Sequence, residues 1–141
     1  MKLTEHLQPE RRAHVEGRLH GNLMAWLTTV RADGQPVSVP VWFLLQDDGT
    51  FLVYSQANKA KLRNVQQNPR VSLALDVTDI GRDIIRVHGT AQQVDDIPPA
   101  HENPQYVVKY AERIGTIFGT AANFAATYSV ALVITPSRLF A

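Results

Sequence analysis

Three short β-rich segments follow one another in the first half of the chain, and tight turns connect them. We predict strands over residues 23–30, 37–45 and 50–55. Asp33-Gly34 lies in the first turn and residues 47–49 (Asp-Asp-Gly) lie in the second; Asp-Gly between apolar runs is typical of β-hairpins. These turns predict an antiparallel meander. Pro40 has no N–H group for a central ladder, so we expect it at a bulge or on an unpaired edge.

Helices and further strands alternate along the rest of the chain. We predict helices over residues 4–19 and 58–67 and from Asn103-Pro104 onward, and strands over residues 70–76, 83–94 and 127–135. Thr4 is the expected cap of the first helix, unless that helix starts later with Pro9 in its first turn. Pro136 is expected to end the last strand.

Two segments are less defined by the pattern. The conformation of residues 118–124 stays open, because Gly115 and Gly119 weaken a helix there. Asp79 and Gly81 are the expected turn residues before the strand 83–94. Six antiparallel strands with helices at the corners predict one mainly β domain over residues 1–141, folded as a small closed or half-closed barrel.

Composition excludes several classes of protein. The 141 residues are 45% hydrophobic and 19% charged with a net charge of +1, which argues against a nucleic-acid-binding protein. The chain has no cysteine, so thiolate catalysis and cysteine-based zinc sites are excluded. No signal peptide is recognised, and no apolar stretch approaches the ~20 residues of a membrane helix. We therefore expect a cytoplasmic protein that does not associate with membranes.

A cluster of cations lies at the start of the predicted helix 58–67. Lys59, Lys61 and Arg63 occupy its first turns, and no Asp or Glu lies between Gly49 and Leu75. A helix N-terminus offers free N–H groups and the positive end of the helix dipole, which suits a phosphate. Neutral donors that could join them are Ser55, Gln56 and Asn58. The alternative interpretation is an ordinary solvated helix start.

No motif for catalysis by the chain's own side chains is present. The five histidines lack metal-ligand spacing, and the HExxH, GxSxG and P-loop patterns are missing. The acidic pairs at residues 47–48 and 95–96 fall in turns. We therefore predict no catalytic side chain and no metal site. Chemistry carried by a bound cofactor needs only a phosphate clamp and a slot for a flat ring.

The segment Val37–Phe43 (VSVPVWF) is the predicted wall of that slot. Backbone groups around Pro40 would be free to face a flat heterocycle. Trp42 would cover the ring or line the substrate side, and the alternative for this side chain is a place in the core or in a dimer interface.

Five short motifs follow one another in the first two thirds of the chain. DGQP, VPVWF, YSQANKAKLRN, NPRVSL and RVHGTA follow one another between Leu23 and Val94. In this order they closely resemble the pyridoxamine-5′-phosphate-oxidase-like flavin and deazaflavin oxidoreductases, and most of all their F420-dependent class. The resemblance continues more weakly to the last strand.

The resemblance implies a six-stranded antiparallel split β-barrel that forms a homodimer, with two cofactor sites at the interface. It implies that Lys61 binds the cofactor phosphate and that residues 39–42 lie along the ring. Arg63 either contacts the ligand or pairs with an acidic group, and Asn64 caps or braces the loop. The expected cofactor-binding residues are Val39, Pro40, Val41, Trp42, Tyr54, Ser55, Gln56, Asn58, Lys59, Ala60, Lys61 and Asn64.

The implied activity is hydride transfer between bound F420 or FMN and a small unsaturated or quinone-like acceptor. The hydroxyl groups of four tyrosines are either proton donors or structural hydrogen-bonding groups: Tyr54, Tyr106, Tyr110 and Tyr128. One alternative function is a flavin- or deazaflavin-binding carrier or sensor without turnover. Another is an interaction domain whose cations at residues 59–63 bind an acidic partner.

Overall fold

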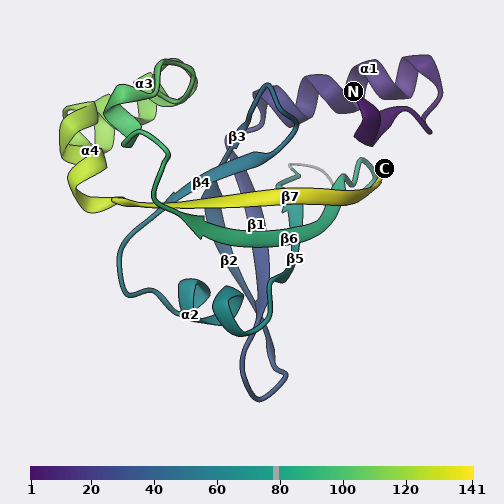
Figure 1. The fold of residues 1–141 in the computed structure, drawn as a ribbon. Helices are drawn as coiled ribbons and strands as arrows, with labels where there is room; N and C mark the ends of the chain where they lie inside the picture. Colours follow the sequence, from purple (N-terminus) through teal and green to yellow (C-terminus); the bar gives the residue numbers. More distant parts are fainter. Residues whose placement is uncertain (78–79) are drawn as a thin grey trace.

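The computed structural model describes residues 1–77 and 80–141, and Figure 1 shows a strongly curled antiparallel sheet with helices at its margins. The sheet has seven strands: β1 (Met24–Val30), β2 (Pro36–Trp42), β3 (Leu44–Leu45), β4 (Phe51–Ser55), β5 (Arg70–Leu75), β6 (Arg86–Val94) and β7 (Val130–Phe140). The α-helices are α1 (Pro9–Gly21), α2 (Ala60–Gln67), α3 (Pro104–Phe118) and α4 (Ala121–Thr127). Short 3₁₀ helices cover Lys2–Thr4 and Ala100–Glu102.

One segment of chain supplies both edges of this sheet. The strand order is β2-β1-β5-β6-β7-β4-β3, and only Phe43 separates β2 from β3 in sequence. β2 pairs with β1, whereas β3 pairs with β4. The chain therefore passes from one edge of the curled sheet to the other at a single residue, as a split barrel requires. The strand predicted over residues 37–45 is thus two strands, and the predicted pairing of sequential neighbours is confirmed.

The predicted turns are present, and glycine permits their geometry. Gly34 and Gly49 both have φ of 88°, in the left-handed region that glycine adopts without a steric penalty. Gly81 has φ of 87° and also lies in a turn, whereas Asp79 lies outside the described residues. Because β2 is an edge strand, Pro40 lies at a sheet edge, as the sequence predicted.

Two apolar clusters hold the sheet and the helices together. Along β1 and β5, buried side chains alternate with more exposed ones; Leu27 and Leu73, which face each other in register, are fully buried. A second cluster lies between β4 and the helices α3 and α4, and includes Leu52, Tyr110 and Phe124. The second cluster fixes α3 and α4 on the sheet (Figure 1).

The N-terminal helix starts later than residue 4. Thr4 is not its cap: it is buried at the end of a 3₁₀ helix, and its hydroxyl contacts the Glu16 carboxylate. α1 begins at Pro9, where the missing N–H group costs no helical hydrogen bond, as the alternative prediction had it. None of the helices in the described ranges has both the length and the apolar character needed to cross a bilayer.

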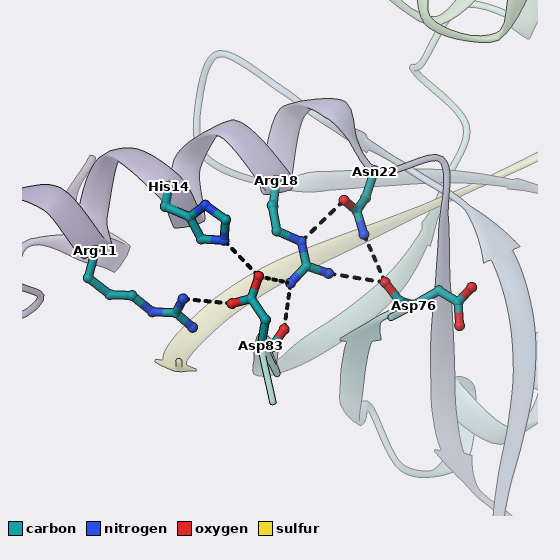
Figure 2. A network of polar contacts seen from close by, with 6 residues as sticks. All are labelled: Arg11, His14, Arg18, Asn22, Asp76 and Asp83. Carbon is teal, nitrogen blue, oxygen red and sulfur yellow. Dashed lines mark hydrogen bonds and ion pairs between the residues drawn. The ribbon is translucent and has the colours of Figure 1, made fainter. Parts of the chain in front are cut away.

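A carboxylate ties α1 to the segment that precedes β6 (Figure 2). Asp83 accepts from Arg11 Nη1 at 2.6 Å, contacts His14 Nε2 at 2.7 Å, and pairs with Arg18 Nη1 at 2.9 Å. Hydrogen bonds from His14 and Arg11 hold the pKa of Asp83 well below its usual range. Arg18 also donates to the Asp76 carbonyl at 3.0 Å. Three side chains from successive turns of one helix thus converge on one loop residue.

Two strand boundaries differ from the prediction. β6 begins at Arg86 instead of residue 83, and β7 runs from Val130 to Phe140, through Pro136. The register shifts between His88 and Gly89, and this irregularity places Pro136 opposite Gly89. A Cβ atom at Gly89 would clash with the Thr135 carbonyl oxygen, so the close approach requires glycine. The strand therefore tolerates a proline that was expected to end it.

Residues 118–124, whose conformation the sequence did not settle, contain the break between two helices. Gly119 has φ of 81° and ends α3, and the Thr120 hydroxyl accepts from the Asn123 N–H at 3.1 Å to cap α4. The glycine that weakened the helix prediction is the residue that lets the chain turn between two helices.

Side chains of α3 satisfy the backbone where β2 ends. The Phe43 N–H donates to Tyr110 Oη at 2.7 Å, and Tyr110 Oη lies 2.7 Å from the Leu23 carbonyl, to which it donates. Lys109 Nζ donates to the Phe43 carbonyl at 2.7 Å and lies 3.9 Å from the centre of the Phe43 ring. Burial lowers the pKa of Lys109 to about 8.

This lysine should make stability depend on pH. Between pH 8 and the ordinary lysine value of 10.5, the unfolded chain holds a proton that folded Lys109 has lost, so the free energy of unfolding should rise with pH in this range. Above pH 10 the buried tyrosines act in the opposite direction, because burial raises the pKa of Tyr106 and Tyr110. Urea denaturation between pH 7.5 and 10 measures this rise in the free energy of unfolding. The rise should be smaller in Lys109→Met, and an equal rise in that variant would contradict the assignment of the effect to Lys109.

Candidate functional site

A cavity of about 210 Å³ lies where β2, β4, α2, α3 and α4 meet. Its lining residues are Pro40, Val41, Trp42, Tyr54, Lys61, Tyr106, Ile117, Phe118, Phe124 and Tyr128. Five of the twelve predicted cofactor residues are among them: Pro40, Val41, Trp42, Tyr54 and Lys61. The fold therefore brings together the predicted ring-facing strand and the predicted phosphate lysine.

Lys61 is the charged residue of this lining, and the other nine lining residues are uncharged. It is half-buried in the first turn of α2. Burial, and secondarily the charge of Lys59, lowers its pKa from the ordinary lysine value. Within residues 1–77 and 80–141 its ammonium group has no hydrogen bond or ion pair. An unpaired, half-buried cation beside an apolar cavity is a place where a ligand anion would be stabilised.

The start of α2 has no side chain as its cap. Its N-cap residue is Lys59, and neither Lys59 nor Ala60 is buried. The preceding Asn58 has φ of 62°, which turns the chain into the helix, and Arg63 Nη1 donates to the Asn58 carbonyl at 3.2 Å. Arg63 thus braces the loop. The first N–H groups of the helix remain available to an external acceptor.

The other predicted residues of this region lie outside the cavity lining. Ser55 is buried, and its hydroxyl donates to the Gln56 carbonyl at 2.8 Å. Asn64 is buried under α2, where its Nδ2 donates to Thr29 Oγ1 at 3.0 Å. Val39 is half-buried and packs against the interior of the curled sheet. Asn64 therefore fastens the helix to β1, in agreement with a bracing role.

Trp42 belongs to a stack of aromatic rings. Its indole lies parallel to the Tyr110 ring at 4.8 Å and to the Phe124 ring at 5.5 Å, and Phe124 stacks in turn on Tyr128 at 4.7 Å. Phe118 packs edge-on against Trp42, with ring centres 6.4 Å apart. Trp42 thus packs against three aromatic side chains of its own chain, and it lines the cavity as part of this aromatic cluster.

The four tyrosines differ in what their hydroxyl groups contact. Tyr54 Oη donates to the Pro98 carbonyl at 2.8 Å, and Tyr110 Oη makes the backbone bonds at Phe43. Tyr106 Oη is buried and has no hydrogen-bond partner in the described part of the chain. Tyr54 and Tyr110 are therefore structural groups, whereas Tyr106 is not satisfied by the fold.

Three cavity residues were not recognised as site residues from the sequence: Ile117, Phe118 and Phe124. The segment 118–124 was left open because of its glycines, so its face toward the sheet could not be assigned. The spacing of Phe124 and Tyr128, one turn apart, was the available signal for a shared aromatic face.

Comparisons with known proteins agree with this fold. The family model described as pyridoxamine 5′-phosphate oxidase matches residues 12–141. Among curated proteins, no sequence matches this chain. An F420 reductase of known structure is 26% identical, with a TM-score of 0.64, over 89% of this chain and 94% of that one.

Two further solved structures share the fold at lower identity. A pyridoxamine 5′-phosphate oxidase-like protein from Listeria innocua is 19% identical, with a TM-score of 0.64, over 91% of this chain and 94% of that one. The heme storage protein HutZ from Vibrio cholerae is 18% identical, with a TM-score of 0.63, over 91% of this chain and 92% of that one. At such identities the likeness shows the fold alone.

The contact between Asn64 and Thr29 should hold α2 in place. Asn64→Ala removes the donor and leaves a buried hydroxyl at Thr29 unpaired, so we expect the free energy of unfolding to fall by about 1–3 kcal/mol. Chemical denaturation measures it. Thr29→Val is the matched variant, and the double variant should lose less than the sum of the two single losses. Strictly additive losses would show that the two side chains are not coupled.

Proposed function

Because the chain belongs to the pyridoxamine 5′-phosphate oxidase family, we propose that it is an oxidoreductase that holds F420 or FMN beside β2 and α2. The observation that carries the proposal is Lys61, the unpaired cation that lines an otherwise uncharged, largely aromatic cavity. The likeness to an F420 reductase favours F420 as the first cofactor to test.

The residues present fit a phosphate-bearing flat ring. Lys61 and the uncapped first turn of α2 would hold the phosphate, and exposed Lys59 would add a second cation near it. At the free edge of β2, N–H and C=O groups around Pro40 would hydrogen-bond the edge of the ring. The cavity of about 210 Å³ is smaller than the ~300–1,000 Å³ of sites that enclose drug-sized ligands. One chain therefore encloses only part of such a cofactor.

The side chains around the cavity would bind the cofactor and shield its ring from water, and none of them is assigned to proton transfer. In its reduced form, bound F420 or FMN would supply a hydride to a small unsaturated or quinone-like acceptor and become oxidised, and solvent would supply the balancing proton. The packed rings of Trp42, Phe118 and Phe124 exclude water from this volume, which favours transfer over side reactions. The hydroxyl groups of Tyr54 and Tyr106 stay protonated at neutral pH, because burial raises the pKa of both.

A second copy of the chain would complete the site. In register across five strands, outward-facing residues form one row: Pro40, Trp26, Ala74, Arg86 and Phe140. Trp26 is 42% exposed, and Arg86 Nε is buried without a hydrogen-bond partner within the described ranges. Aromatic and arginine side chains are enriched in protein interfaces. The row begins at Pro40, which also lines the cavity, so a partner seated on it would reach the cofactor.

Paired titrations of the apo protein with FMN and with F420, followed by absorbance and fluorescence, test the cofactor. Lys61→Ala should weaken binding of the preferred cofactor by roughly 1.5–3 kcal/mol, because a charge-assisted phosphate contact is lost. The matched control is Arg63→Ala, which removes a nearby cation that braces the loop and should cost less. Binding of neither cofactor would overturn the proposal.

Turnover separates an enzyme from a carrier. The reduced protein-bound cofactor is mixed with a quinone, and its reoxidation is compared with that of free cofactor. Faster reoxidation on the protein indicates an oxidoreductase, and no acceleration indicates a carrier or sensor.

If the protein forms the proposed dimer, its apparent mass in sedimentation should depend on protein concentration. Wild type should sediment as a dimer at micromolar concentration, and Trp26→Lys should shift it toward monomer, because a buried interfacial charge has no partner. Val108→Lys is the matched control, since Val108 on α3 is 79% exposed and lies outside the row. A wild-type monomer would remove the interfacial site.

A further inference from the structure

We infer that Tyr106 is the residue that recognises the acceptor, by donating a hydrogen bond from its hydroxyl group to a carbonyl oxygen on a one- or two-ring ketone or quinone. The inference extends the proposed function, on which it rests for the identity of the reaction, and it names the chemical class of the acceptor.

The first argument is the contrast between two tyrosines on one helix. Tyr106 and Tyr110 are one turn apart on α3, and both are fully buried. Tyr110 Oη bridges the backbone of Phe43 and Leu23, whereas Tyr106 Oη has no partner among the described residues. Buried polar atoms in folded proteins are nearly always paired, because an unpaired one costs free energy. Tyr106 is also one of the residues that line the cavity, so its unpaired hydroxyl is a candidate for contact with a ligand there.

The second argument is the chemistry of the lining around Tyr106. Aromatic rings surround it: Tyr54 at 4.8 Å edge-on, and Phe124 at 5.7 Å. Phe118 and Ile117 add apolar surface to the same cavity. Such walls favour a flat, uncharged ring. Lys61 is the charged lining residue and is assigned to the cofactor phosphate, so the ligand atom that meets Tyr106 should be neutral.

The third argument is the state of the hydroxyl group. Burial above all, and then the neighbouring hydroxyl groups of Tyr110, Tyr54 and Tyr128, raise the pKa of Tyr106 far above its ordinary value. The group therefore keeps its proton throughout the physiological pH range and acts as a donor. Its complement is an acceptor atom such as a carbonyl oxygen. Without cofactor, the volume of about 210 Å³ admits a ligand of one or two rings.

Two probes with the same skeleton test the inference: 1-indanone, which carries one carbonyl group, and indane, which carries none. Dissociation constants are measured by ligand-observed NMR on the full chain without cofactor. Wild type should bind 1-indanone more tightly than indane. Tyr106→Phe should weaken 1-indanone roughly three- to tenfold, as expected for one neutral hydrogen bond, and leave indane unchanged.

Thermal denaturation supplies a second readout, because two tyrosine variants should shift the melting temperature in opposite directions. Tyr106→Phe should raise the melting temperature of the ligand-free protein, because it removes a buried hydroxyl that has no partner. Tyr110→Phe is the matched control: it should lower the melting temperature, because the Phe43 N–H loses its acceptor, and it should leave the preference for 1-indanone over indane intact.

Three results would overturn the inference. They are equal binding of the two probes by wild type, an unchanged preference in Tyr106→Phe, and a lower melting temperature for Tyr106→Phe, which would mark its hydroxyl as structural. The outcome is independent of cofactor binding. A protein that selects 1-indanone through Tyr106 but binds neither FMN nor F420 would keep the inference about the cavity and lose the proposed redox function.

Discussion

The hydrogen bond from the Phe43 N–H to Tyr110 Oη satisfies the backbone at the residue where the chain passes from one edge of the curled sheet to the other. Phe43 lies between the two edge strands, so its backbone groups leave one edge before they can join the other. Tyr110 and Lys109 supply the partners that the ladder does not. The same contact fixes α3 over the end of β2. The same two side chains of α3 therefore satisfy the crossing residue and hold the helix against the end of β2.

The candidate site follows directly from this crossing. Trp42 precedes the crossing residue and stacks on Tyr110, and α4 contributes Phe124, whose ring is also parallel to the indole. The aromatic cavity thus forms only when β2, α3 and α4 are all in place. Lys61 reaches it from α2, which Asn64 holds on the sheet. The site supplies one cation, flat walls and one unsatisfied hydroxyl, which is what a protein contributes when a cofactor carries the chemistry.

Local signals predicted the parts of the fold that depend on neighbouring residues. The Asp-Gly turns predicted the hairpins correctly, because glycine adopts positive φ without a steric penalty. Boundaries set by distant residues were missed. β7 continues through Pro136 because Gly89, far away in sequence, allows the close approach and the register shift. Thr4 did not cap α1, because its hydroxyl faces Glu16 in the folded chain.

The sequence by itself determined the two hairpin pairings around Gly34 and Gly49, a bulge or edge position for Pro40 and the placement of cations at a helix start, because turn chemistry and helix polarity act over a few residues. Only the tertiary structure decided which of these residues share a cavity. Lys61 and Tyr106 are far apart in the chain, yet both line the cavity, whereas Asn64, three residues from Lys61, bonds Thr29 of β1 and is not among the lining residues. Side-chain direction on a helix depends on what the helix packs against, and that packing is a property of the whole fold.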